Sequence, residues 1–177
     1  MIWLLFLAVF ATAGASSIAA AVVGRVDWVR QMRAAVDAAL PQLGPAARLL
    51  IVAHAAYESG WGSARAARYF NVFNLTAGSA WSGPSWVDVG GDSDGAGNRI
   101  TQTWRMYSSL QECVADYWHF LGPTANHGRY VLARAALAAG DVPTFVLELS
   151  SAGYFALSPG QYLTGLSTVL EQVKGIV

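Results

Sequence analysis

The stretch AHAAYESGWG, residues 53–62, determines both the fold and the chemistry expected of this chain. It completes an apolar segment, Leu49 to Tyr57, that predicts a buried helix. Glu58 follows directly, and a carboxylate in such surroundings is costly unless it is paired or used. An apolar wall is expected to raise the pKa of Glu58, which suits a general acid near neutral pH. Gly60 and Gly62 then end the helix and allow backbone or substrate to come close.

Regular hydrophobic patterns extend on both sides of this stretch. A period of 3.6 residues predicts helices over residues 26–40, 46–59, 63–68, 108–121, 130–139, 142–150 and 159–173. Two segments, residues 85–89 and 99–106, alternate apolar and polar side chains and predict a hairpin. The connection between them, GGDSDGAGN at 90–98, predicts a mobile polar loop. Residues 25–177 are therefore expected to form one mostly helical α+β domain with a small β-hairpin lobe.

The N-terminal segment, residues 1–24, has no charged side chain, and Arg25 is the first charged residue. Because about 20 apolar residues can span a bilayer, this segment predicts a transmembrane anchor. The alternative is a cleaved signal peptide with its cleavage site at AGA, residues 13–15. We favour the anchor, since no basic residue precedes the apolar run. Arg25, Arg30 and Arg33 would then tend to keep the following domain on the cytoplasmic side, a conflict that a virion membrane protein would escape.

The composition argues against several classes of function. The formal net charge is zero and 12% of residues are charged, whereas a nucleic-acid-binding protein needs a basic surface. Cys113 is the only cysteine, so no intrachain disulfide is expected, and a buried apolar role is favoured over a nucleophile. No His-Glu-x-x-His motif occurs, and the aspartates of the polar loop lack the end ligands of a calcium loop. No metal or other cofactor is expected.

Several motifs, in the same order and at similar spacing, resemble glycoside hydrolase family 73, the β-N-acetylglucosaminidases of bacterial cell walls. They are ESGWG at 58–62, NVFNL at 71–75, WSGP at 81–84, WRMYSS at 104–109, and the pairs Asp116-Tyr117, Arg129-Tyr130 and Gly153-Tyr154. The resemblance covers about residues 49–173. It implies a lysozyme-like fold with Glu58 as the catalytic acid.

The resemblance also implies a second carboxylate on the hairpin, because glycoside hydrolysis generally uses two. The family has a Glu eight positions after its Gly-Pro pair. Counted from Pro84, that position is Asp92 here, with Asp94 and Asp88 as rivals. If none of them acts, the acetamido group of the substrate could assist the reaction instead.

Further site residues follow from the matching motifs. Tyr154 is expected beside the acid, although the segment after it, FALSPGQY at 155–162, is two residues longer than in the family and lacks its Asp. His54 lies one turn before Glu58 and is expected to hydrogen-bond it. Asn74 replaces a family Gly, which is tolerable because Asn also adopts left-handed backbone conformations. The residues expected to bind substrate are Trp61, Asn71, Phe73, Trp81 and Tyr162.

These expectations combine into a membrane-anchored peptidoglycan hydrolase that cuts the glycan strand at β-1,4 linkages of N-acetylglucosamine. It would face the periplasm or cell wall, or belong to a virion membrane, with glycan strands and envelope-machine or virion proteins as partners. One alternative is a lytic transglycosylase, which leaves an anhydro product. The other is a membrane or virion structural protein that binds glycan without cleaving it.

Overall fold

The computed structural model describes residues 24–93 and 98–177, without the side chains of residues 91–93. The anchor predicted over residues 1–24 lies, except for Gly24, outside the described residues. No helix in the described ranges is both long and apolar enough to cross a membrane. The helices are residues 24–39, α2 (Pro45–Ser59), η1 (Arg65–Tyr69), α3 (Leu110–Phe120), η2 (Asn126–Gly128), α4 (Val131–Ala139), α5 (Val142–Ser151) and α6 (Pro159–Lys174).

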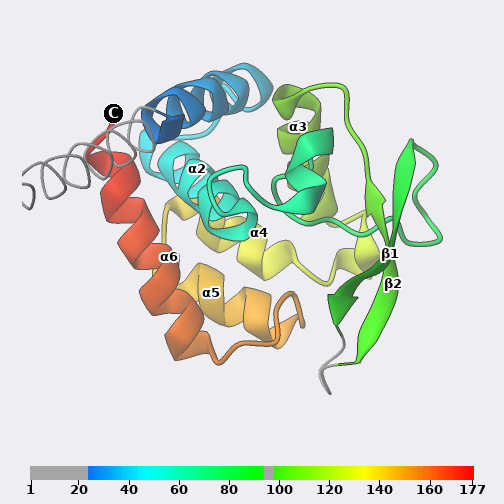
Figure 1. The fold of residues 1–177 in the computed structure, drawn as a ribbon. Coiled ribbons are helices and arrows are strands. Elements are labelled where there is room, and N and C mark those ends of the chain that lie inside the picture. The colour runs from blue at the N-terminus through cyan, green and yellow to red at the C-terminus, as the bar shows by residue number, and fades with distance from the viewer. Residues whose placement is uncertain (1–23, 94–97) are drawn as a thin grey trace, which may run out of the picture.

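Helix α2 lies in the middle of the fold, enclosed by the other helices (Figure 1). Its residues from Leu50 to Ala56 are all buried, as the continuous apolar run predicts. Complete burial of an aliphatic side chain such as Ile51 is worth about 1.5–3 kcal/mol. Pro45 occupies the first turn, where its missing N–H costs nothing. The predicted central helix is confirmed, and it carries Glu58 out of the core at its C-terminal end.

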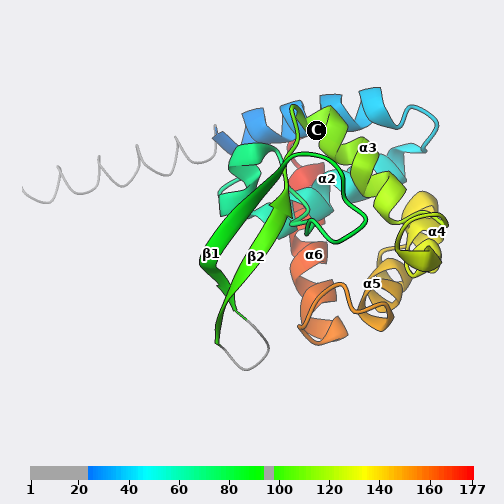
Figure 2. The same cartoon turned by 90° about the vertical axis from the view of Figure 1, so that its right-hand side faces the viewer.

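Helix α6 lies against α2 and places Tyr162 beside Glu58. A Cβ added at Gly165 would come within 2.6 Å of the Tyr57 ring, so only glycine permits this approach. The Ser158 hydroxyl accepts a hydrogen bond from the backbone N–H of Gln161 and caps the N-terminus of α6. The chain then ends close to the first helix, as both ribbon views show (Figures 1 and 2).

The hairpin consists of β1 (Ser85–Ser93) and β2 (Arg99–Arg105), paired antiparallel. The expectation that β1 ends at residue 89 is wrong, because the strand continues to Ser93. Its register changes between Asp88, which pairs with Gln102, and Asp92, which pairs with Ile100. A bulge absorbs the additional residues on β1, and Gly90 adopts a φ of +63° there. Glycine and aspartate, which suggest a loop, here occupy a bulged strand.

The hairpin extends from one side of the helical body (Figure 2). Residue contacts between the hairpin and the helices are few in the described part of the chain. Asp88 is buried and forms an ion pair of 2.9 Å with Arg65 of η1. The rings of Trp86 and Tyr69 pack at 5.2 Å between centroids. The predicted class, a mostly helical α+β fold with one small sheet, is confirmed.

Candidate active site

Glu58 is the penultimate residue of α2, and 15% of its side chain is exposed. The helix ends at Gly60 with φ +55°, and its N–H bonds to the carbonyl of Ala56. Trp61 and Gly62 also have positive φ, +60° and +82°. Three successive left-handed residues turn the chain sharply, and a positive φ at a bulky tryptophan is uncommon outside functional sites. The turn leaves the Glu58 carboxylate at the edge of the core.

Three side chains lie close to Glu58, two from distant parts of the chain and one from the preceding turn of α2. The Tyr162 hydroxyl of α6 donates a hydrogen bond to Oε1. Nδ2 of Asn74 donates to the Glu58 backbone carbonyl at 2.7 Å and lies 3.5 Å from Oε2. Nε2 of His54 lies 3.6 Å from Oε1, so His54 is close to the acid as predicted, but the predicted hydrogen bond between them is not formed. The left-handed conformation expected of Asn74 is confirmed by its φ of +51°.

His54 continues this network into the core. The imidazole is completely buried, with Nε2 2.7 Å from the Tyr162 hydroxyl and Nδ1 2.9 Å from the Tyr117 hydroxyl. The network therefore runs from Tyr117 on α3, through α2, to Tyr162 on α6 and back to Glu58. Tyr117 is not among the predicted site residues, and Asn74 is expected there only for its backbone conformation. The His54 spacing was the one sequence signal for the network, because its tyrosine partners lie far apart in the chain.

Burial is the largest single influence on the pKa of Glu58 and raises it, as the apolar helix predicts, but the polar neighbours together outweigh it. The polar side chains around the carboxylate, His54, Tyr162 and Asn74, act in the opposite direction and lower it. Together they hold the pKa of Glu58 below its ordinary value. The predicted raised pKa is therefore wrong for the protein without substrate, because the polar partners favour the carboxylate more than burial disfavours it.

Tyr154 lies close to this network without joining it. Its hydroxyl donates to the backbone carbonyl of Phe73 at 2.8 Å, and its ring packs 5.6 Å from the His54 ring. Burial, followed by the nearby charge of Glu58, raises the pKa of Tyr154 well above its usual range. The hydroxyl holds the segment that carries Asn74, and so Tyr154 is positioned to act through that segment.

The aspartates proposed as second carboxylate are placed differently. Asp88, one of the two rivals of Asp92, forms an ion pair with Arg65 of η1. Asp92 is a register partner of Ile100 on the distal part of the hairpin, and its side chain lies outside what the structure describes. Asp94 lies outside the described residues altogether. Of the three, Asp92 keeps both the strand position and the match to the family.

The residues expected to bind substrate fall into two groups. Asn71 and Phe73 are buried: the Asn71 amide bonds to the backbone of Leu75 at 2.9 Å, and Phe73 stacks on Tyr117 at 3.8 Å. Tyr162 is also buried, at 2% exposure, and lies behind Glu58. These three hold other parts of the site in place. Of the five residues expected to bind substrate, Trp61 and Trp81 are the two that are partly exposed.

Trp61 packs against the first helix. Its ring meets that of Trp28 edge-on at 6.0 Å, and the Arg25 guanidinium lies 5.0 Å from it. Gly62 lies so close to Trp28 that an added Cβ would be 2.5 Å from the indole nitrogen. The Trp61 ring is therefore partly covered by Arg25 and Trp28 of the first helix, which precede the ESGWG motif.

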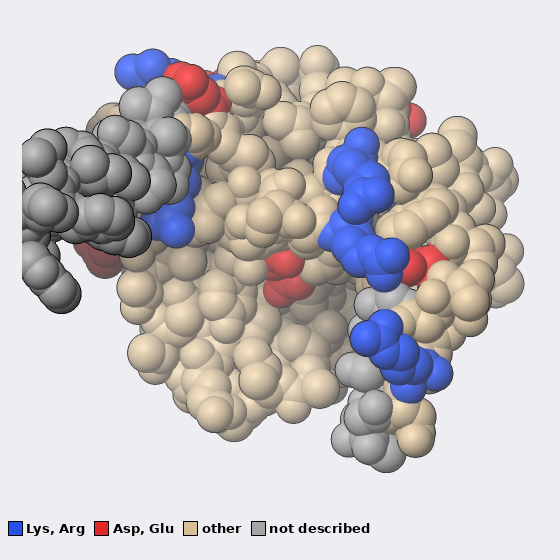
Figure 3. All heavy atoms as spheres, in the orientation of Figure 1, with Lys and Arg blue, Asp and Glu red and all other residues tan. Residues whose placement is uncertain are grey.

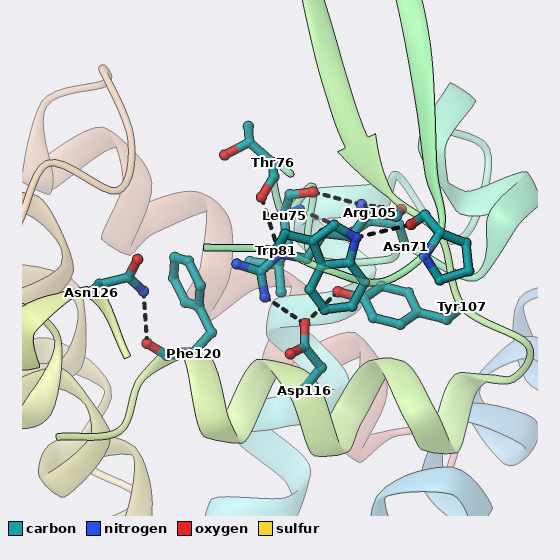
Figure 4. A network of polar contacts seen from close by, with 10 residues as sticks. Asn71, Leu75, Thr76, Trp81, Arg105, Tyr107, Asp116, Phe120 and Asn126 are labelled. Atoms are coloured by element: carbon teal, nitrogen blue, oxygen red, sulfur yellow. Dashed lines mark hydrogen bonds and ion pairs between the residues drawn. The ribbon is translucent and has the colours of Figure 1, made fainter. Parts of the chain in front are cut away.

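Trp81 lies beside a hollow of about 630 Å³ formed by residues 76–82, the end of α3 and the segment around η2. The Arg105 guanidinium lies between two rings, 4.6 Å from Trp81 and 5.3 Å from Phe120 (Figure 4). Arg105 also pairs with Asp116 at 2.7 Å, and Tyr107 donates to the same carboxylate. An aromatic wall with a fixed polar network suits a sugar ring better than an ion, because the charge of Arg105 is already neutralised.

The face seen in Figure 3 is largely uncharged, and basic side chains gather on the side where the hairpin lies. Among the described residues, no group of three His, Cys, Asp or Glu side chains could hold a metal ion. The chemistry that the described side chains offer is therefore that of a partly exposed carboxylate with an inner hydrogen-bond network.

Comparisons with known proteins agree with this geometry. The sequence model of the glucosaminidase family, described as mannosyl-glycoprotein endo-β-N-acetylglucosaminidase, matches residues 34–175. The peptidoglycan hydrolase FlgJ of Salmonella typhimurium is 31% identical over 133 residues, which are 72% of this chain and 40% of the relative. FlgJ of Pseudomonas aeruginosa is 30% identical over 155 residues, 84% of this chain and 36% of the relative. The chain thus matches less than half the length of these relatives.

Solved structures give the same match over nearly whole domains. The glycoside hydrolase domain of Salmonella typhimurium FlgJ superposes with a TM-score of 0.62 and 27% identity, covering 86% of this chain and 89% of that one. A peptidoglycan hydrolase from Sphingomonas sp. A1 gives a TM-score of 0.64 at 27% identity, covering 85% and 92%.

Proposed function

The chain belongs to the glucosaminidase family, and from this premise we propose that it is a peptidoglycan hydrolase that cuts β-1,4 bonds of N-acetylglucosamine within the glycan strand. Supporting evidence comes from the similarity to FlgJ and from the likeness of the whole domain to solved hydrolase domains. The observation that carries the proposal is the position of Glu58. Its carboxylate is partly exposed at the end of a buried helix, with Oε1 bonded inward to Tyr162.

In the proposed reaction Glu58 donates a proton to the glycosidic oxygen as the bond to the anomeric carbon breaks. The oxocarbenium-like centre then needs a negative group or an activated water. Asp92 is the proposed second carboxylate, supported by its match to the family position and its place on β1. The acetamido group of the sugar is the alternative partner for this step.

We further propose that the hollow beside Trp81 receives a sugar of the strand remote from the cut bond. Phe73 and Asn74 lead from the Glu58 network to Thr76, which lines the hollow. The ring of Phe120, also in its lining, packs 6.3 Å from Tyr154. The segment 73–76 and the Phe120 ring therefore lie between the hollow and Glu58, as is needed for one glycan strand to contact both.

The location we propose is outside the cytoplasmic membrane, either at the cell wall with residues 1–24 as an anchor or on a virion membrane. Its support is the nature of the substrate and the apolar N-terminal sequence. Protease accessibility of the tagged C-terminus in intact spheroplasts is the appropriate measurement. Protection of the tag would contradict an external domain.

The test of the activity is digestion of purified peptidoglycan by the protein and by Glu58→Gln, with reduced products analysed by mass spectrometry. We expect reducing-end N-acetylglucosamine from the wild type and a rate lower by about 10²–10⁴-fold in the variant, since that is the usual contribution of a general acid. Anhydromuramyl ends would indicate a transglycosylase. Glycan binding without cleavage by either protein would indicate the structural alternative.

A further inference from the structure

His54 has no part in the reaction just proposed, yet its side chain is completely enclosed beside the site. It has no exposed surface, and both ring nitrogens have a partner. Its ring is surrounded by those of Phe73, Tyr117, Phe145, Tyr154 and Tyr162. In a neutral imidazole one ring nitrogen donates a hydrogen bond and the other accepts one. In a buried imidazole with two hydroxyl partners, those partners decide which nitrogen carries the proton.

Tyr117 fixes that direction. Its hydroxyl is completely buried, and among the described side chains its single hydrogen-bond partner is Nδ1 of His54. The hydroxyl proton can be satisfied only if Nδ1 accepts it, because a buried donor without an acceptor costs about 1–3 kcal/mol. Nδ1 must then carry no proton. A neutral imidazole without a proton on Nδ1 carries it on Nε2.

The rest of the chain of bonds follows from this tautomer. Nε2–H donates to the Tyr162 oxygen at 2.7 Å, and Tyr162 has one proton, which it donates to Oε1 of Glu58. Each proton from Tyr117 onward therefore points toward Glu58. The reverse direction would require a proton on Oε1 and on Nδ1, and it would leave the Tyr117 hydroxyl proton without an acceptor.

We propose that His54 is a positioning residue, held as the Nε2–H tautomer by Tyr117, which commits Oε1 of Glu58 to accepting a hydrogen bond and leaves Oε2 to carry the catalytic proton. The proposal rests on the proposed function for its catalytic consequence. Its structural content, the tautomer and the direction of the bonds, does not depend on that function. In the reversed chain the proton would lie on the inward-facing Oε1, bonded to Tyr162, where it could not reach the glycan.

The first measurement is nitrogen NMR of the full chain labelled with 15N-histidine, in detergent at pH 7. The chain has three histidines, so three imidazoles give signals, and the one missing from His54→Gln belongs to His54. We expect the neutral Nε2–H pattern for it. The Nδ1–H tautomer or the imidazolium would overturn the proposal, whether or not the protein cleaves glycan.

The second measurement compares three variants for kcat and KM. His54→Leu removes both bonds, and we expect kcat to fall at least about tenfold with KM within about twofold, since misplacement of a reacting group acts on the rate. His54→Gln should recover most of that loss, because its amide oxygen can accept from Tyr117 while its NH₂ donates to Tyr162. Tyr117→Phe should lower kcat severalfold and abolish the single-tautomer signal.

Tyr107→Phe is the matched control, because it also removes a buried tyrosine hydroxyl, here bonded to Asp116 and without contact to His54 or Glu58. It should leave the His54 signal unchanged. If His54→Gln is as slow as His54→Leu while both melt near the wild-type temperature, a positioning role through hydrogen bonds is wrong. If the NMR result holds but wild type cleaves no glycan, the proposed function fails and the tautomer assignment stands.

Discussion

Glu58 holds its carboxylate with polar partners that favour the charged form, and this has a consequence for pH dependence. A general acid acts only when protonated, so kcat/KM should fall as the pH rises through the pKa of free Glu58. Because that pKa is lowered by His54, Tyr162 and Asn74 against the effect of burial, the fall should begin below the ordinary range near about 4.3. A bound sugar removes the remaining water, which raises the pKa, so kcat should fall at higher pH than kcat/KM.

The measurement is the pair of pH–rate profiles on a soluble glycan fragment. Profiles that fall at the same pH would contradict the effect of substrate on Glu58. A kcat/KM that stays level up to neutral pH would contradict the lowered pKa itself.

Tyr162, expected only to bind substrate, donates to the acid, whereas Tyr154, expected beside the acid, donates to the Phe73 carbonyl. Tyr162→Phe removes the donor to Oε1, so the pKa of Glu58 should rise and the alkaline fall of kcat/KM should move to higher pH. Tyr154→Phe removes only the bond to the Phe73 carbonyl, so the rate should drop without a shift of the profile. Equal shifts in both variants would mean that Tyr154 contacts the acid in solution.

At this scale the acid itself is predictable from the sequence, and its surroundings are not. Glu58 follows from an apolar run and two glycines, which are local features. The hydrogen bonds of Tyr117 and Tyr162 join positions 63 and 108 residues away from His54, and no local pattern reports such a distance. For the same reason the apolar environment suggested a raised pKa, while the folded partners lower it.

Helix α6 is positioned by the absence of a side chain at Gly165. Gly165→Ala would place a Cβ within 2.6 Å of the Tyr57 ring, so either the ring or the helix must move. We expect a loss of about 1–3 kcal/mol in the free energy of unfolding, as in other overpacked cores, together with a lower kcat because Tyr162 moves with the helix. Gly160→Ala in the first turn of α6 meets no atom within 4 Å and should be neutral or stabilising. Chemical denaturation of both variants is the measurement, and equal stabilities would contradict the close approach.

The helices could be predicted closely, and the hairpin less well. Caps and periodicity define α5 and α6 to within about a residue, because proline and aspartate or serine mark their first turns. In β1, glycines and aspartates suggest a loop after residue 89. Asp92 pairs with Ile100 across the hairpin, and this pairing depends on the bulge in β1. The length of β1 is therefore decided by its pairing with β2, which a local sequence pattern does not report.

For the molecule as a whole, the first helix belongs to the hydrolase domain although the family match begins at residue 34. Val29 and Met32 have no exposed surface, and Trp28 covers Gly62 at the end of α2. A chain of residues 24–177 should melt like the full protein. A chain of residues 34–177 should lose roughly 3–6 kcal/mol, the burial of two apolar side chains, which is a large part of a typical domain's stability. Calorimetry of the two chains is the measurement, and similar melting temperatures would contradict an integral first helix.

The position of Asp92 on the distal part of the hairpin bears on the stereochemistry of the product. Carboxyl groups about 5–5.5 Å apart retain the anomeric configuration, and those about 6.5–9.5 Å apart invert it. Glu58 is fixed by the core, whereas Asp92, the proposed second carboxylate, lies beyond the bulge of β1. The contacts of Asp88, Trp86 and Arg105 that join the hairpin to the helices lie on the other side of that bulge. Whether the released sugar is the α or the β anomer would then be set by how far the hairpin closes on the glycan.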